Sequence, residues 1–179
     1  MEVDKRINYF DRQFLRAKDF QAEQSYSIHR RRLHNQLMHT SGIAGEDQLS
    51  IEHSLEQNTL TVQPGTALDD QGQEIVLVNA RMLQLDREPD ITGEGTYALY
   101  VKYDEQLTDG SPDPGLNGFP TRVQEIPLLK FQKLADPPSY PPLTLAAVVV
   151  DQEKRLKAAP DVGMRTLVGT KMGFTGAFD

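Results

Sequence analysis

The first part of the chain has the hydrophobic spacing of an α-helix. No glycine or proline occurs from Phe20 through His39, and Gly42 then provides a natural stop. Apolar residues recur at spacings of four, seven and four, which places them with His29 on one helical face. Asp19 is the expected N-cap. The residues of this predicted face are Ala22, Tyr26, Leu33 and Leu37.

From Leu49 onward the period changes to two, which is typical of β-strands. Short alternating runs are separated by turn signals such as Pro64-Gly65. The run Thr96 to Tyr103 is a predicted strand. One face of this strand carries Tyr97, Leu99, Val101 and Tyr103.

Two later segments are predicted to take different positions in a sheet. Residues 143–150 are apolar throughout, which predicts a central strand covered on both faces. Residues 123–134 are interrupted by Pro127, which confines this segment to a sheet edge or splits it.

Two other segments lack a clear period. Residues 104–121 are rich in glycine and proline and are predicted to form a long loop, a kind that tends to be functional or mobile. Residues 161–179 form a tail that is more apolar than a solvated tail requires, so we expect an extended docking arm that orders on a partner. Its apolar residues include Leu167, Phe174 and Phe178.

These patterns predict an α+β fold: an N-terminal helix, an antiparallel β-sandwich or barrel-like domain, and an extended C-terminal arm. The expected division is a helical docking segment over residues 1–45, a β-rich domain over 46–160 and the arm over 161–179.

Charge divides the chain in the same way. Residues 1–40 hold eight Lys or Arg against five Asp or Glu, whereas residues 41–179 hold eleven against twenty-one. A basic helical segment on an acidic body indicates two surfaces with different partners. Ordinary variation between a helix and a sheet is the plainer explanation of this difference.

Several classes of function find no support in the sequence. The chain has no cysteine and no phosphate-binding glycine motif, and no segment approaches the length of a membrane span. His29, His34 and His39 are five residues apart, so on a helix they point in different directions and cannot share a metal ion. We therefore expect no catalytic residues, no metal, no cofactor and no membrane partner.

Arg30, Arg31 and Arg32 form the densest basic cluster. On a helix they span about 200° and make no single stripe. The acidic isoelectric point argues against nucleic acid as a partner. Ion pairing with an acidic neighbouring protein and a solvated helix face remain the two explanations.

The N-terminal half resembles a family of attachment domains from the baseplate and tail-fibre proteins of tailed phages and contractile injection systems. The motifs of that family are a YFDGQFL-like stretch, a DFxxEQ segment, an RRxLHNxLxH helix and a PGxALD…GxEI pattern. Arg12 stands where many relatives have glycine. The matching residues here are Tyr9–Leu15, Asp19–Gln24, Arg31–His39, Pro64–Asp69, Gly72, Glu74 and Ile75.

The resemblance implies a structural, non-enzymatic component of a virion tail or injection-particle baseplate, assembled in the bacterial cytoplasm. It would attach a tail fibre or other appendage through protein–protein contacts with other baseplate, tail or fibre proteins. A homo-oligomer is expected, with a trimer favoured by analogy to fibres. Besides the three residues of the tail, the expected docking residues are Tyr9, Phe10, Phe14, Leu15, Arg16, Arg30, Arg31 and Arg32.

Two alternatives stay open. A receptor- or carbohydrate-binding module of a tail fibre would use the 104–121 segment, with Tyr100, Tyr103 and Phe119 as stacking residues. A glycan-degrading enzyme of the tail would need a pair of carboxylates across a cleft, and no motif supports one.

Overall fold

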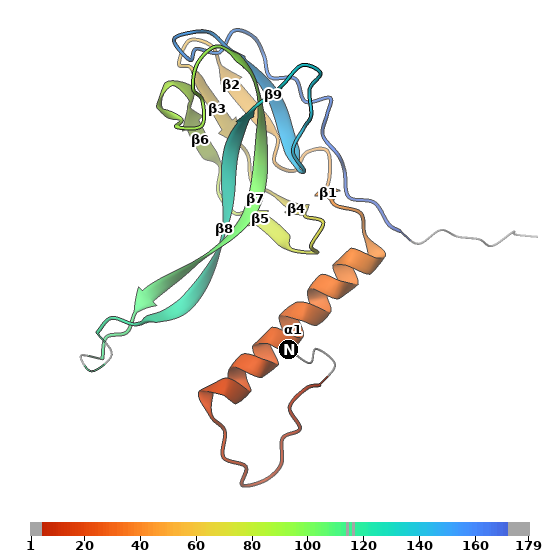
Figure 1. Ribbon diagram of the computed structural model, residues 1–179, viewed down its shortest axis with the longest axis vertical. Helices are drawn as coiled ribbons and strands as arrows, with labels where there is room; N and C mark the ends of the chain where they lie inside the picture. The colour runs from red at the N-terminus through yellow and green to blue at the C-terminus, as the bar shows by residue number, and fades with distance from the viewer. Residues whose placement is uncertain (1–4, 114, 116, 172–179) are drawn as a thin grey trace, which may run out of the picture.

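The computed structural model describes residues 5–113, 115 and 117–171. One long helix is followed by antiparallel strands, as the sequence predicts (Figure 1). The elements are α1 (Ala17–Met38), β1 (Gly42–Ile43), β2 (Ile51–Ser54), β3 (Thr59–Val62), β4 (Gly65–Leu68), β5 (Glu74–Leu77), β6 (Arg81–Gln84), the 3-10 turn Leu85–Arg87, β7 (Gly95–Gly110), β8 (Pro120–Lys133) and β9 (Thr144–Val150).

The described strands form three antiparallel three-stranded sheets, with the orders β1-β4-β5, β2-β3-β6 and β8-β7-β9. Their inner faces enclose one core. The predicted face of the β7 strand is confirmed, because Tyr97, Leu99 and Val101 are buried and Tyr103 packs against the same core. The buried Tyr97 hydroxyl donates to the Gly93 carbonyl at 2.9 Å, so its polar atom is satisfied.

The segment 104–121 is not a long loop, which corrects the sequence-based expectation. β7 continues to Gly110 and β8 begins at Pro120, and the two pair in register almost to their ends. Figure 1 shows the outer part of this hairpin projecting from the body on the same side as α1. The glycines and prolines that suggested a loop lie mainly in the turn between the strands.

Of the two strand positions expected from the sequence, the edge position of residues 123–134 is confirmed and the central position of residues 143–150 is wrong. β8 is an edge strand, as Pro127 predicted. The 143–150 strand is buried but not central, because β9 stands at the other end of its sheet. Its free edge is covered by bridges from Leu156 to Val150 and from Asp161 to Ala147. Most β9 side chains are buried in the common core, and the later chain rather than a second strand covers the free edge of β9.

The helix begins earlier than expected and packs on a different face. It starts at Ala17, and the Asp19 carboxylate, three positions after the cap residue, accepts the Arg16 backbone N–H at 2.8 Å. Asp19 is thus not the N-cap. Of the predicted apolar face, Leu37 and His29 are exposed, and Asn35 is instead the buried residue of α1. The helix is joined to the body by polar side chains.

Residues 161–171 lie along the body. Leu167 bridges Ile43 of β1, and the Lys171 backbone N–H donates to the Met38 carbonyl at the end of α1 at 2.8 Å. Phe174 and Phe178, expected as docking residues, lie outside the described residues. None of the helices in the described ranges has the length and apolar character that a bilayer crossing demands.

Candidate functional site: the helix joint and its projecting arms

The helix meets the body at the turn between β4 and β5. The Asn35 side-chain amide donates to the Gly72 carbonyl at 3.0 Å and to the Glu74 carboxylate at 3.1 Å. A buried amide needs such partners, because leaving it without them costs about 1–3 kcal/mol. These two bonds therefore fix the end of α1 on the turn.

Gly72 allows the close approach of the turn and the helix. Its φ is +74°, a left-handed conformation that L side chains rarely adopt. A Cβ atom at this position would overlap the backbone carbonyl of Arg32. Glycine is required here both by its own conformation and by its neighbour.

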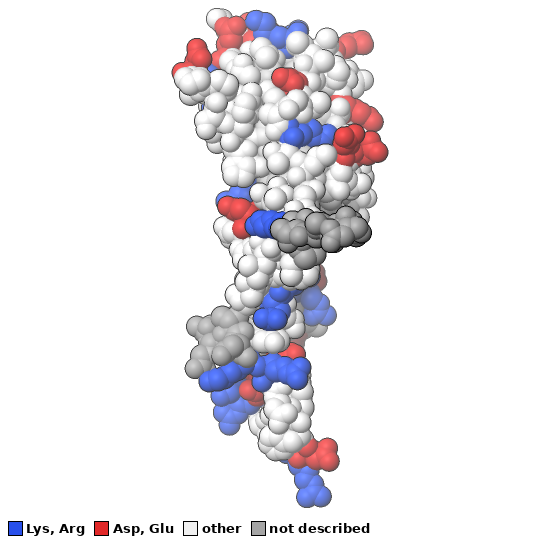
Figure 2. Space-filling model, turned by 90° about the vertical axis from the view of Figure 1, so that its right-hand side faces the viewer, with Lys and Arg blue, Asp and Glu red and all other residues white. Residues whose placement is uncertain are grey.

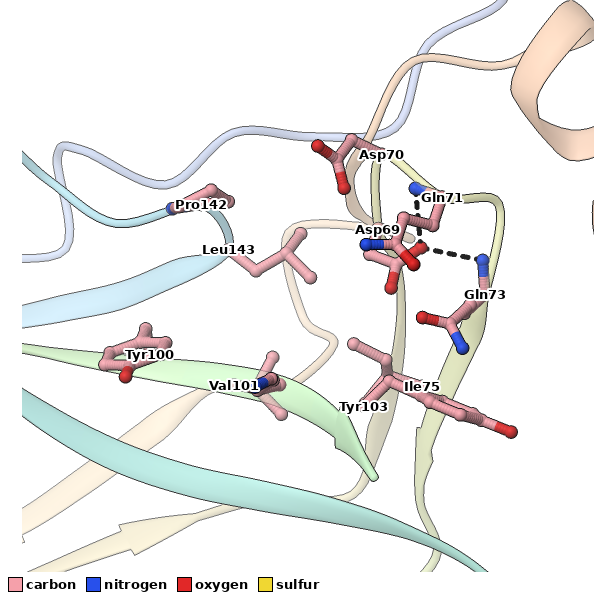
Figure 3. A pocket seen from close by; sticks show the side chains of 11 residues that line it. Asp69, Asp70, Gln71, Gln73, Ile75, Tyr100, Val101, Tyr103, Pro142 and Leu143 are labelled. Atoms are coloured by element: carbon pink, nitrogen blue, oxygen red, sulfur yellow. Dashed lines mark hydrogen bonds between the residues drawn. The ribbon is translucent and has the colours of Figure 1, made fainter. Parts of the chain in front are cut away.

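The Asp69 side chain stabilises the same turn by accepting hydrogen bonds from its backbone. Its carboxylate accepts the backbone N–H groups of Gln71 at 3.0 Å and Gln73 at 2.7 Å (Figure 3). Burial raises the pKa of Asp69 above its usual 3.8, although the bonds from Gln73 and Gln71 act in the opposite direction. The turn is preorganised to receive the helix.

Arg32 links the helix to the base of the hairpin. Its guanidinium donates to the Glu105 carboxylate at 3.3 Å and to the Tyr103 hydroxyl at 3.4 Å, and lies 5.5 Å from the centroid of the Tyr103 ring. The Tyr103 hydroxyl in turn donates to Glu105 at 2.6 Å. Burial first, and then this bond to Glu105, raise the pKa of Tyr103 above its usual range. A neighbouring exposed pair joins Arg31 and Glu125 at 3.7 Å.

Beyond this joint the outer hairpin and the N-terminal segment are uncovered. Leu107 and Val123 are register partners and are 70% and 59% exposed. Phe10 and Phe14 precede the helix and are 66% and 82% exposed. Contiguous exposed apolar patches are typical of surfaces that bind other proteins, which makes these two segments candidate docking surfaces.

The charge division is visible on the surface. In Figure 2, Lys and Arg gather over the lower, projecting part of the molecule, whereas most Asp and Glu lie over the upper body. Of the arginine cluster, Arg31 and Arg32 are paired with glutamates of the hairpin. Arg30 is exposed and has no ion pair with an acidic side chain among the described residues.

A cavity of about 250 Å³ lies beside the joint (Figure 3). Its walls include Tyr100, Val101 and Leu143, with Asp69 and Asp70 at one side. Across the described residues, no group of three or more His, Cys, Asp or Glu is placed to hold a metal ion. The cavity is mainly an apolar recess.

The structure brings some expected residues together and separates others. Tyr100 and Tyr103 line the same cavity, but Phe119 lies at the far end of the hairpin, where its carbonyl accepts the Ser111 N–H. The three cannot form one stacking surface as the single loop site required. Tyr9, Phe10, Phe14, Leu15 and Arg16 stand together before the helix, and Leu167 lies 41% exposed beside β1.

Sequence reasoning missed the residues that make the joint. Asn35 and Gly72 were visible only as members of motifs, with no contact assigned between them. A useful signal was an asparagine inside a helix, a type that competes with helical bonding unless its side chain has a defined partner.

No protein-family model matches the chain, and no curated protein matches its sequence. Among solved structures, the crystal structure of TssK has 13% sequence identity and a TM-score of 0.43. The match covers 89% of this chain and 41% of the TssK chain, so this chain spans about two fifths of that protein. A likeness this weak does not carry a function from TssK to this chain.

Proposed function

We propose that the chain is a structural docking module of a phage tail or a phage-tail-like injection particle. In this proposal it attaches a tail fibre or other appendage to the baseplate through protein–protein contacts. It acts as a homo-oligomer, with a trimer favoured, and has no catalytic role. The particle is assembled in the bacterial cytoplasm.

One observation carries this proposal: the two motif segments that resemble attachment domains contact each other. Asn35 belongs to the RRxLHNxLxH segment, and Gly72 and Glu74 belong to the PGxALD…GxEI segment. The motifs therefore describe one structural unit, a turn that holds a helix away from the body. Their joint presence supports a resemblance that each motif alone would leave weak.

The geometry of the unit suits attachment. The helix α1 has 22 residues, and most of the stability of a helix in a protein comes from packing one of its faces against another surface. Here α1 is fixed at its C-terminal end and leaves Phe20 54% and Leu37 62% exposed. Such a helix is suited to binding a neighbour along its length.

The outer face of α1 offers a direct test. Arg30 and Leu37 are seven residues apart and so share a face of the helix. The full chain carrying Arg30→Glu and Leu37→Ser would be tagged and used to capture proteins from cells that produce the particle. A matched control, Leu55→Ser with Arg87→Glu, makes the same changes at exposed positions of the body.

The unaltered chain and the control are expected to capture baseplate, tail or fibre proteins, identified by mass spectrometry, and the helix variant is expected to lose them. Capture of no such protein by the unaltered chain would contradict the proposed function. Equal capture by all three proteins would contradict the role of the helix face.

The cavity beside the joint favours a second candidate, a receptor- or carbohydrate-binding module. Tyr100 and the carboxylates Asp69 and Asp70 line one recess, an arrangement able to bind a sugar ring. The Arg32 guanidinium near the Tyr103 ring weakens this candidate, because that ring already has a stacking partner. Binding of host glycans by the unaltered chain, lost on Tyr100→Ala, would support it.

A further inference from the structure

The outer hairpin is an uncovered surface with a defined apolar centre. Glu105 pairs with Glu125 and Leu107 pairs with Val123, so the side chains of these four residues lie on one face of the ribbon. An isolated two-stranded ribbon is marginally stable in water. Arg32 and Arg31 of α1 reach Glu105 and Glu125 on this face, and the apolar pair Leu107 and Val123 beyond them is left exposed.

The hairpin is also acidic. Residues 104–125 hold five Asp or Glu against one Arg. The glutamates at its base are already engaged by Arg31 and Arg32 of α1. Asp109 and Asp113 lie farther out and are exposed. A partner for this region should combine apolar side chains with positive charge.

The N-terminal arm, residues 6–16, has that chemistry. It holds three Arg against one Asp, and carries Tyr9, Phe10 and Phe14, each more than half exposed. The hydrogen bonds found for residues 10–16 are local, such as the Gln13 N–H to the Phe10 carbonyl. The aromatic groups of the arm are therefore available to another molecule.

The arm does not cover the hairpin of its own chain. Ala17 is fifteen residues before Arg32, so the start of the helix lies about 22 Å along the axis from the joint. In Figure 1 the arm leaves this end of α1 and turns toward the side opposite the hairpin. Each copy thus presents an uncovered basic aromatic arm and an uncovered acidic apolar ribbon.

We propose that the N-terminal arm of one copy binds the outer hairpin of a second copy. The molecule that covers the hairpin is another copy of this chain, because the same chain supplies both complementary surfaces. Since arm and hairpin are different patches, the contact is head-to-tail, and its repetition closes a ring when the rotation between copies allows. This deepens the proposed function by specifying the partner of the arm, and it leaves the outer face of α1 for the particle.

Self-association of the purified full chain tests the contact separately from capture of particle proteins. The arm variant carries Arg6→Glu and Arg12→Glu, and the hairpin variant carries Asp109→Lys and Asp113→Lys. A matched control carries Glu46→Lys and Asp47→Lys, which change two exposed acidic residues of the body. Molar mass would be measured by light scattering over a range of protein and salt concentrations.

The unaltered chain and the control are expected to associate at low salt and less at high salt, because screening weakens exposed charge pairs. Each reversed variant alone should stay monomeric at concentrations where the control associates. A one-to-one mixture of the two variants should associate again, since each reversed arm then meets a reversed hairpin. A monomeric unaltered chain, or a mixture that does not recover, would overturn the proposal.

Cross-linking gives a second readout that does not depend on charge. The chain has no cysteine, so Phe14→Cys and Leu107→Cys introduce the sole thiols in two separate proteins. Mixed and treated with a short bis-maleimide, they should give a heterodimer that the pair Phe14→Cys with Leu55→Cys does not give. Equal yields from both pairs would contradict the assigned contact.

Discussion

The side-chain amide of Asn35 and the carbonyl of Gly72 are joined by a buried hydrogen bond of 3.0 Å that spans 37 positions of the sequence. This bond connects a projecting helix to a turn of the β body. Around it the chain uses polar contacts where a helix would ordinarily bury an apolar stripe. The attachment of α1 is therefore sensitive to single polar substitutions.

Replacing Asn35 with alanine should loosen the helix. The Gly72 carbonyl and the Glu74 carboxylate would lose their donor, at a cost of about 1–3 kcal/mol. Hydrogen exchange of the α1 amides should accelerate more than exchange in β7 and β9. Gln21→Ala, at an exposed position of the same helix, serves as control and should leave exchange near the joint unchanged.

Replacing Gly72 with alanine should be more damaging than replacing Gly45 with alanine. The left-handed conformation alone costs a residue with a side chain about 1–2 kcal/mol, and the overlap with Arg32 adds to it. Gly45→Ala is the control, because a Cβ there meets its nearest atom at an ordinary 3.6 Å. Equal midpoints of urea unfolding for the two variants would show that the turn does not need this approach.

Replacing Tyr103 with phenylalanine should weaken the link between hairpin and helix. The variant removes the hydroxyl that donates to Glu105 at 2.6 Å, while the ring stays beside Arg32. A bond to a charged group in this half-exposed setting contributes about 1 kcal/mol. The matched variant is Tyr100→Phe on the same strand. Amide exchange at residues 104–110 should rise in the first variant and not in the second.

Ionisation of the Asp69 carboxyl should make the folded protein less stable as the pH rises. Its folded-state pKa is raised above 3.8, so the folded protein holds the proton more tightly than the unfolded chain does. Its ionisation therefore lowers stability as the pH rises from below 3.8 through the raised value. At pH values above the folded-state pKa, the stabilisation that the protonated carboxyl provides is fully lost.

The Asp69→Asn variant cannot ionise and keeps an oxygen for the N–H groups of Gln71 and Gln73. Its stability relative to the unaltered chain should be greater at pH 7 than at pH 3. Urea unfolding at the two pH values measures this difference. A difference of the opposite sign would mean that the hydrogen bonds outweigh burial at this carboxyl.

The sequence predicted the parts of the fold that alternate between apolar and polar residues. The buried face of β7 through Tyr103 followed from its period of two, and the edge position of β8 followed from Pro127. The outer hairpin was missed because both of its faces are largely exposed. Without a buried face, residues such as Gln106 and Thr108 carry no periodic signal. The glycines and prolines of the turn therefore determined the prediction of a loop.

The candidate site was predictable only in part, for a related reason. The apolar spacing around Leu33 and Leu37 pointed to a packing face of which Leu37 is exposed and Leu33 only half-buried, and the helix is joined to the body through Asn35 and Arg32. Single-residue spacing cannot indicate which distant turn receives a polar side chain. The aromatic groups of the arm were identified from the YFDGQFL-like stretch, and they are exposed in the structure.

The most direct test of the docking role is the composition of assembled particles. Particles would be purified from cells that make the unaltered chain, the Arg30→Glu/Leu37→Ser variant, or the Leu55→Ser/Arg87→Glu control, and their proteins would be quantified by mass spectrometry. The account predicts a fixed amount of this chain and of the appendage per particle with the unaltered chain and the control, and loss of both with the helix variant. Particles that contain none of the unaltered chain, yet carry their full set of appendages, would contradict it.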